Sequence, residues 1–226
     1  MNNITGKVVV TTDAGSQLGE AAARNLSEQG AVVALGSKKL HRIRELAREL
    51  VRNGARVKAV QADKRQKTQV EDLVRQAATA FGTVDVLVTC RDAVRGQDGQ
   101  DGAPAHSRPA GGIEQGRIPA AIGAVLPLML SQRRGHIIAL LCAADTAQLA
   151  DFGNAPGAGV LFVTLQASNI RTTTIFAKAP VQPDGVGRGC AASFARALVF
   201  AIKQPVGVAV NEIVIGAPAR HTGSEP

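Results

Sequence analysis

The chain has 226 residues, a length that suits one α/β domain with a full core. It lacks tryptophan and tyrosine and has only 6 phenylalanines, so its core must be mainly aliphatic. The net charge of +8 comes from basic residues spread over predicted helix faces without interleaved aromatic side chains, a pattern that argues against nucleic-acid binding.

Apolar runs alternate with amphipathic stretches over the first 90 residues. The runs are typical of buried strands, and the stretches between them repeat apolar residues at helical spacing. Strands are predicted over 8–12, 31–35, 56–61 and 84–89, and helices after the first strand, over 38–53 and over 67–81. This β-α-β rhythm predicts a doubly wound parallel sheet with helices on both faces.

Residues 91–112 interrupt this rhythm. The span is rich in glycine and charge and has few large apolar residues, so it predicts a long loop. Helices are predicted beyond it over 113–133, 156–168 and 190–203, and strands over 136–142, 171–176 and 208–215. We expect about seven strands in one domain, 1–226, that ends in a frayed tail over 216–226.

The turn after the first strand carries the most informative motif, Thr12-Asp13-Ala14-Gly15-Ser16-Gln17-Leu18-Gly19. It leads into a helix N-terminus, where free amides and the helix dipole favour an anion. With this turn, the chain resembles the short-chain dehydrogenase/reductase family, whose Thr-Gly-x-x-x-Gly-x-Gly motif is matched at Thr12 and Gly19. Further segments that carry the resemblance are 4–7, 85–88, 124–127, 135–138 and 211–213. The resemblance covers nearly the whole chain and implies a Rossmann-like fold.

The resemblance also implies a site for a nicotinamide dinucleotide. The cofactor-binding positions fall on Thr12, Gly15, Leu18, Gly19, Lys38, Lys39 and Asp63. Lys38 and Lys39 follow the second strand, where relatives that prefer NADP carry basic residues, although they could equally be surface charges at a helix start. Asp63 follows the third strand, where the family contacts adenine. Asp13 and Gln17 replace glycines of the motif, and Asp13 puts a negative charge beside the phosphates. We therefore expect NADP binding to be weak or lost.

The family's catalytic residues are replaced at the positions that the resemblance assigns. Its asparagine falls on Glu114, its serine on Cys142, and its tyrosine and lysine on Ala155 and Gly159. Alanine and glycine can neither protonate a nascent alkoxide nor bind the nicotinamide ribose. Glu114, Cys142 and Asp145 are therefore candidate catalytic groups. A helix-terminal charge is the alternative for Glu114, and a small buried residue is the alternative for Cys142.

Three functions fit this pattern. The first is a redox-inactive binding or regulatory protein with a degenerate NADP-type site. The second is a repurposed cyclase, isomerase or lyase that uses acid/base residues of the old cleft, and the third is an atypical NADP-dependent oxidoreductase. The expected partner is a small-molecule ligand or a protein, with a homodimer as one option, and no membrane, nucleic acid or metal. Without a signal-peptide pattern or an apolar segment of membrane length, a cytoplasmic protein is expected.

Overall fold

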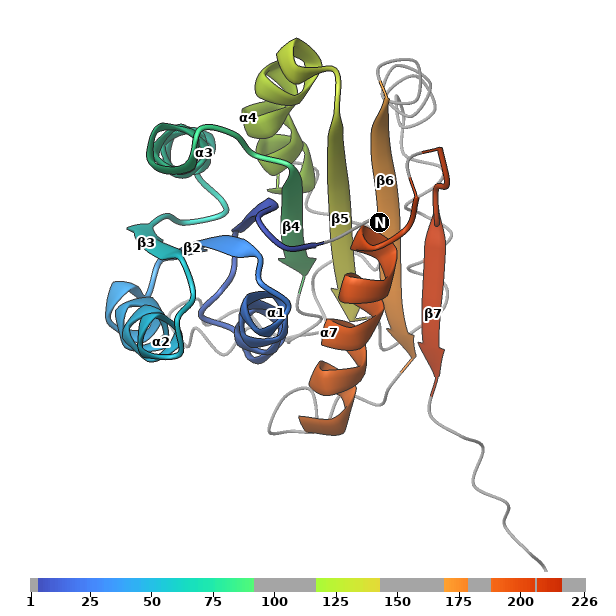
Figure 1. Cartoon of the computed structure of the whole chain (residues 1–226), viewed down its shortest axis with the longest axis horizontal. Coiled ribbons are helices and arrows are strands. Elements are labelled where there is room, and N and C mark those ends of the chain that lie inside the picture. Colours follow the sequence, from blue (N-terminus) through green and yellow to red (C-terminus); the bar gives the residue numbers. More distant parts are fainter. Residues whose placement is uncertain (1–3, 92–116, 143–168, 179–187, 206, 217–226) are drawn as a thin grey trace, which may run out of the picture.

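The computed structural model describes residues 4–91, 117–142, 169–178, 188–205 and 207–216. Seven parallel strands form one sheet in the order β3-β2-β1-β4-β5-β6-β7 (Figure 1). The strands are β1 Val8–Thr11, β2 Val32–Ser37, β3 Val57–Gln61, β4 Val86–Arg91, β5 Gly135–Cys142, β6 Ile170–Lys178 and β7 Glu212–Gly216. The helices among these residues are α1 Gln17–Glu28, α2 Leu40–Arg52, α3 Lys67–Phe81, α4 Arg117–Gln132 and α7 Arg188–Ile202. The predicted Rossmann-like α/β fold is confirmed.

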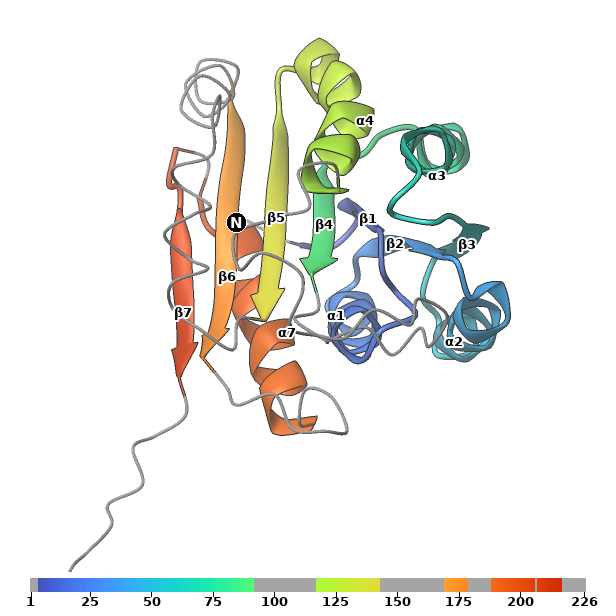
Figure 2. The same cartoon turned by 180° about the vertical axis from the view of Figure 1, so that it is seen from behind.

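The helices cover both faces of the sheet. The helix α7 lies in front of the sheet in Figure 1, and α4 lies in front of it in the reverse view of Figure 2. Helices α1 and α2 pack on the same face as α7, and α3 packs beside α4 on the other. No helix among the described residues is long and apolar enough to cross a membrane.

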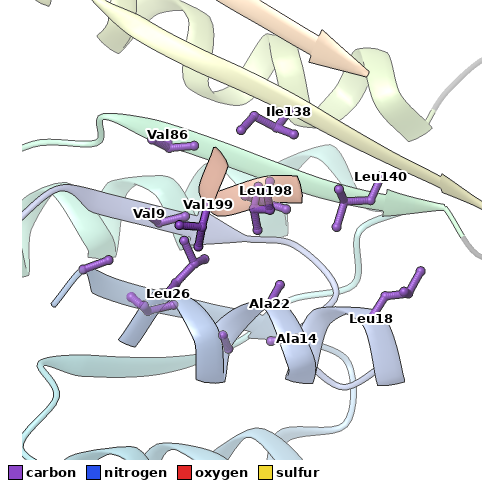
Figure 3. Close-up of a cluster of buried hydrophobic side chains, with 14 of the residues drawn as sticks. Val9, Ala14, Leu18, Ala22, Leu26, Val86, Ile138, Leu140, Leu198 and Val199 are labelled. Atoms are coloured by element: carbon purple, nitrogen blue, oxygen red, sulfur yellow. The ribbon is translucent and has the colours of Figure 1, made fainter. Parts of the chain in front are cut away.

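Each face of the sheet has its own apolar core because successive side chains of a strand point to opposite sides. On β1, Val9 belongs to the cluster under α1, α2 and α7, whereas Val10 belongs to the cluster under α3 and α4. Figure 3 shows the first cluster, with Leu18 of α1 inside it. Apart from Phe194 and Met129, the buried residues of both clusters are aliphatic, as the composition predicts.

The last strand begins later than the sequence predicts, at Glu212 rather than at residue 208. Side chains of β6 hold the segment before it. A guanidinium N–H of Arg171 donates to the Val208 carbonyl at 3.4 Å, and the Thr173 hydroxyl donates to the Val210 carbonyl at 2.6 Å. Because side chains bind these carbonyls, the segment follows β6 without joining the strand ladder there.

The other predicted helices and strands of the described residues are confirmed within a few residues of their bounds. Two ends differ: Arg91 belongs to β4 rather than to the predicted loop, and Gly216 ends β7 rather than beginning the tail. The predicted helix over 156–168, the rest of the loop over 92–112 and the tail over 217–226 lie outside the described residues.

Candidate functional site

The candidate site lies where the chain changes direction across the sheet. From β1 the chain builds β2 and β3 on one side, and β4 then starts the other side, so the carboxyl ends of β1 and β4 form a topological switch point. Thr12 joins these two ends. Its amide donates to the Val88 carbonyl at 3.1 Å, and its buried hydroxyl donates to the Thr89 hydroxyl at 3.4 Å. The turn that follows Thr12 is therefore anchored over the crevice.

Ser16 organises this turn and begins α1 as its N-cap residue. Its hydroxyl accepts a hydrogen bond from the Gly19 amide at 3.1 Å and donates to the Asp13 carbonyl at 2.9 Å. The amides of Gly15, Gln17 and Leu18 have no acceptor among the described residues. Open amides at the start of a helix, together with the helix dipole, can bind a phosphate.

Replacing Ser16 with alanine should lower the free energy of unfolding by about 1 kcal/mol, because the Gly19 amide loses its acceptor. Chemical denaturation measures this difference. Ser131→Ala is the matched control, since the exposed Ser131 hydroxyl only donates to a carbonyl near the end of α4 and should cost far less. An equal loss in both variants would contradict the capping role of Ser16.

The two glycines of the turn allow close approach. A Cβ on Gly15 would press against the Ser37 hydroxyl at the end of β2, and a Cβ on Gly19 would overlap the Asp13 backbone carbonyl. The Leu18 side chain is buried in the core, so only its amide can serve the site. Both glycines are thus required by the close packing of the turn itself.

The Asp13 carboxylate, which the sequence places beside the phosphates, does not stand alone in the structure. Lys64 Nζ lies 2.5 Å from Asp13 Oδ2, and the two side chains are 22% and 19% exposed. Sequence reasoning missed this pairing because the residues are 51 positions apart. The sequence position of Lys64 could have indicated the pairing. Lys64 comes three residues after β3, so it lies at the carboxyl ends of the strands, as Asp13 does.

The remaining predicted cofactor residues surround the same edge. Lys38 and Lys39 are exposed after β2, and the Lys39 amide donates to the Ser37 hydroxyl at 3.1 Å. Asp63 follows β3, where its Oδ1 accepts from the Arg65 amide at 2.9 Å. The structure thus brings cations from the end of β2 and a carboxylate from the end of β3 toward the turn after β1.

The predicted catalytic residues are only partly described. Cys142 is the last residue of β5, and its backbone pairs with β6 at the carboxyl edge of the sheet. Glu114 and Asp145 lie outside the described residues, as do Ala155 and Gly159. Their roles stay predictions. No cluster of histidine, cysteine or acidic side chains within the described ranges could hold a metal.

A family profile described as short chain dehydrogenase matches residues 7–153, which is more than half of the chain. The chain belongs to the short-chain dehydrogenase/reductase family. The match includes the turn after β1 and the strands on both sides of the switch point. The family membership expected from the sequence is therefore confirmed.

Relatives of this family member align with nearly all of its length. An uncharacterized oxidoreductase of Staphylococcus saprophyticus is 28% identical, with 95% of this chain and 97% of the relative covered. A glycine betaine reductase of Emericella nidulans is 26% identical over 94% of this chain, which spans only 19% of that protein. A solved metagenomic short-chain oxidoreductase in complex with NADP has the same fold, with a TM-score of 0.68 and 22% identity over 94% of this chain and 97% of that one.

These similarities correct the function expected from the sequence. The expectation of a redox-inactive binding or regulatory protein is wrong, because a relative that matches nearly end to end is named an oxidoreductase and a solved protein of the same fold holds NADP. The same findings do not favour a non-redox enzyme. Of the three functions, they favour the third, an oxidoreductase.

Proposed function

We propose that this short-chain dehydrogenase/reductase is an NADP(H)-dependent oxidoreductase acting on a small carbonyl compound or alcohol. The observation that carries the proposal is the start of α1 at the switch point, with three amides that have no acceptor among the described residues. The two glycines let the turn pack closely against the end of β2 and against its own backbone. When bound, the cofactor supplies or accepts a hydride. The names of the relatives support the same chemistry.

The residues of the chain would bind the cofactor from three strand ends. The amides of Gly15, Gln17 and Leu18 would hold the pyrophosphate at the start of α1. Lys38 and Lys39 would bind the 2′-phosphate of the adenosine ribose, and Asp63 would contact adenine. The Lys64 ammonium compensates the Asp13 carboxylate, which removes the main electrostatic objection to this arrangement.

The proton donor must be displaced from its usual place, since the resemblance puts Ala155 and Gly159 at the positions of the family's tyrosine and lysine. Carbonyl reduction adds a hydride to carbon and a proton to the oxygen, so an acid has to lie within hydrogen-bonding reach of that oxygen. We propose Cys142, Glu114 and Asp145 as the candidates. Cys142 is a candidate because it lies at the carboxyl end of β5, where parallel α/β sheets bind their ligands.

Three further proposals concern partners and location. The substrate is a small molecule, the assembly is a homodimer, and the protein works in the cytoplasm. Nucleic acid is not proposed as a partner, because basic residues of the helix surfaces bind neighbouring acids. Arg24 of α1, for example, binds both Glu20 and Glu49. Sedimentation velocity of the purified chain tests the dimer.

The proposed function is tested by NADPH consumption with a panel of aldehydes and ketones, beside calorimetric titration of NADPH, NADP, NADH and NAD at low salt. We expect NADPH to bind more tightly than NADH. Replacing both Lys38 and Lys39 with alanine should reduce that preference by about tenfold, as expected when a charged contact to phosphate is lost. Lys67→Ala, on the exposed side of α3, is the control. No consumption of NADPH with any substrate, and no binding of any dinucleotide, would refute the proposal.

A further inference from the structure

The Asp13–Lys64 pair crosses the end of a strand that lies between its two partners. Asp13 follows β1 and Lys64 follows β3, and β2 separates these strands in the sheet. Neighbouring strands are about 4.8 Å apart, so β1 and β3 are about 10 Å apart. The 2.5 Å contact between Lys64 Nζ and Asp13 Oδ2 closes this gap above β2.

Backbone hydrogen bonds fix both turns against the end of β2. The Ala14 amide, beside Asp13, donates to the Gly36 carbonyl at 2.9 Å. The Ala62 amide, two residues before Lys64, donates to the Ser37 carbonyl at 3.1 Å. The two charged side chains are therefore carried by rigid turns on either side of the strand end from which Lys38 and Lys39 emerge.

We propose that Lys64 is a third phosphate-binding cation of this site, and that Asp13 holds it in place and restrains its use. This inference rests on the proposed function, because the ligand is the 2′-phosphate of an adenosine cofactor at the end of β2. A phosphate oxygen would bind the positive charge of the Lys64 ammonium through a charge-assisted hydrogen bond. The carboxylate competes with the phosphate for the same positive charge. Asp13 thus weakens the binding of a 2′-phosphorylated ligand, and Lys64 strengthens it.

The Asp13 and Lys64 side chains are suited to this competition between carboxylate and phosphate because they are neither fully buried nor fully exposed. At 22% and 19% exposure, the pair is screened by solvent less than a surface ion pair, and an incoming anion can still reach it. Lys67 offers a contrast in the same part of the chain. It faces Glu71 across one turn of α3 at 3.6 Å and is 66% exposed.

The test is calorimetric titration of the full chain at low salt with adenosine 2′,5′-bisphosphate and with AMP, which lacks the 2′-phosphate. Asp13→Asn should tighten binding of the bisphosphate by about fivefold, and Lys64→Gln should weaken it by about tenfold. Both variants should change AMP affinity by less than about twofold. The double variant should resemble Lys64→Gln, since Asp13 acts through Lys64. The matched control, Lys67→Gln, should bind like the unmodified chain.

Several results would overturn the inference. Equal effects on the bisphosphate and AMP would show that Lys64 does not bind the 2′-phosphate. Unchanged affinities with a lower melting temperature in both single variants would reduce the pair to a structural tie between turns. Absence of bisphosphate binding in every variant would also overturn it. The expected binding pattern without NADPH consumption by any substrate would refute the oxidoreductase and leave this inference standing.

Discussion

Replacing Gly19 with alanine should lower the free energy of unfolding by about 3 kcal/mol, the upper range for an overpacked site. Gly19 lies in the first turn of α1, where an added Cβ would overlap the carbonyl group of Asp13 and approach the Ala14 Cα. These are backbone atoms of a turn anchored to β2 and β4, so they cannot rotate away as a side chain could. The substitution must move the turn or the start of α1.

Chemical denaturation of Gly19→Ala measures this loss, and the displaced turn should also weaken dinucleotide binding. Gly123→Ala is the matched control. Gly123 lies on the exposed side of α4, and a Cβ there would meet no atom within 4 Å. Alanine should therefore stabilise that helix by about 0.5–1 kcal/mol. A Gly19 variant as stable as the unmodified chain would show that the turn is less rigid than its hydrogen bonds indicate.

Most of the fold could be predicted because it depends on local patterns. Helix α3 has the predicted bounds, Lys67–Phe81, since its buried residues Val70, Leu73, Val74 and Ala77 repeat at helical spacing. The strand β7 was harder to predict. The apolar residues 208–210 predict an earlier start, yet Arg171 and Thr173 of β6 bind the carbonyls of Val208 and Val210, and no local pattern reveals such contacts.

The candidate site was predictable where a motif fixes the backbone and not where distant side chains meet. The turn around Gly15 and Gly19 could be placed from the strand and helix patterns on either side. The partner of Asp13 could not, because Lys64 reaches it through tertiary structure from the end of β3. The prediction that Asp13 opposes phosphate binding therefore did not take into account the positive charge of Lys64. The oxidoreductase function that we propose depended on the relatives, because the sequence alone led us to expect a redox-inactive protein, whereas a relative that matches nearly end to end is named an oxidoreductase.

Acidification should destabilise the fold through His136, which lies near the amino end of β5, away from the candidate site at the carboxyl ends of the strands. This ring is 2% exposed, and its Nε2 lies 2.7 Å from the Thr173 hydroxyl. That hydroxyl donates its single proton to the Val210 carbonyl, so it must accept from Nε2–H. The Nδ1 atom of the ring has no partner among the described residues. Burial lowers the pKa of His136 to about 3, and the charges of Arg171 and Lys7 add to the effect.

The sign of the pH dependence follows from the two states. The pKa of histidine in an unfolded chain is about 6.5, so between that pH and about 3 the unfolded chain binds the proton and the folded protein does not. The free energy of unfolding is therefore highest above pH 6.5 and falls as the pH falls through this window, by about 1.4 kcal/mol per pH unit. Between pH 7 and pH 5 the loss from His136 should be about 2 kcal/mol.

Denaturation of His136→Gln at pH 7 and pH 5 measures this contribution. The glutamine amide can still donate to Thr173 but takes up no proton in this range. The difference in free energy of unfolding between pH 7 and pH 5 should therefore largely disappear. His41→Gln, on the exposed face of α2, is the control and should keep the full difference. The comparison uses the slope of the free energy of unfolding against pH. This slope reports titration of the ring and is not changed by the packing cost of the substitution. An equal slope in His136→Gln and the unmodified chain would place the acid sensitivity elsewhere in the protein.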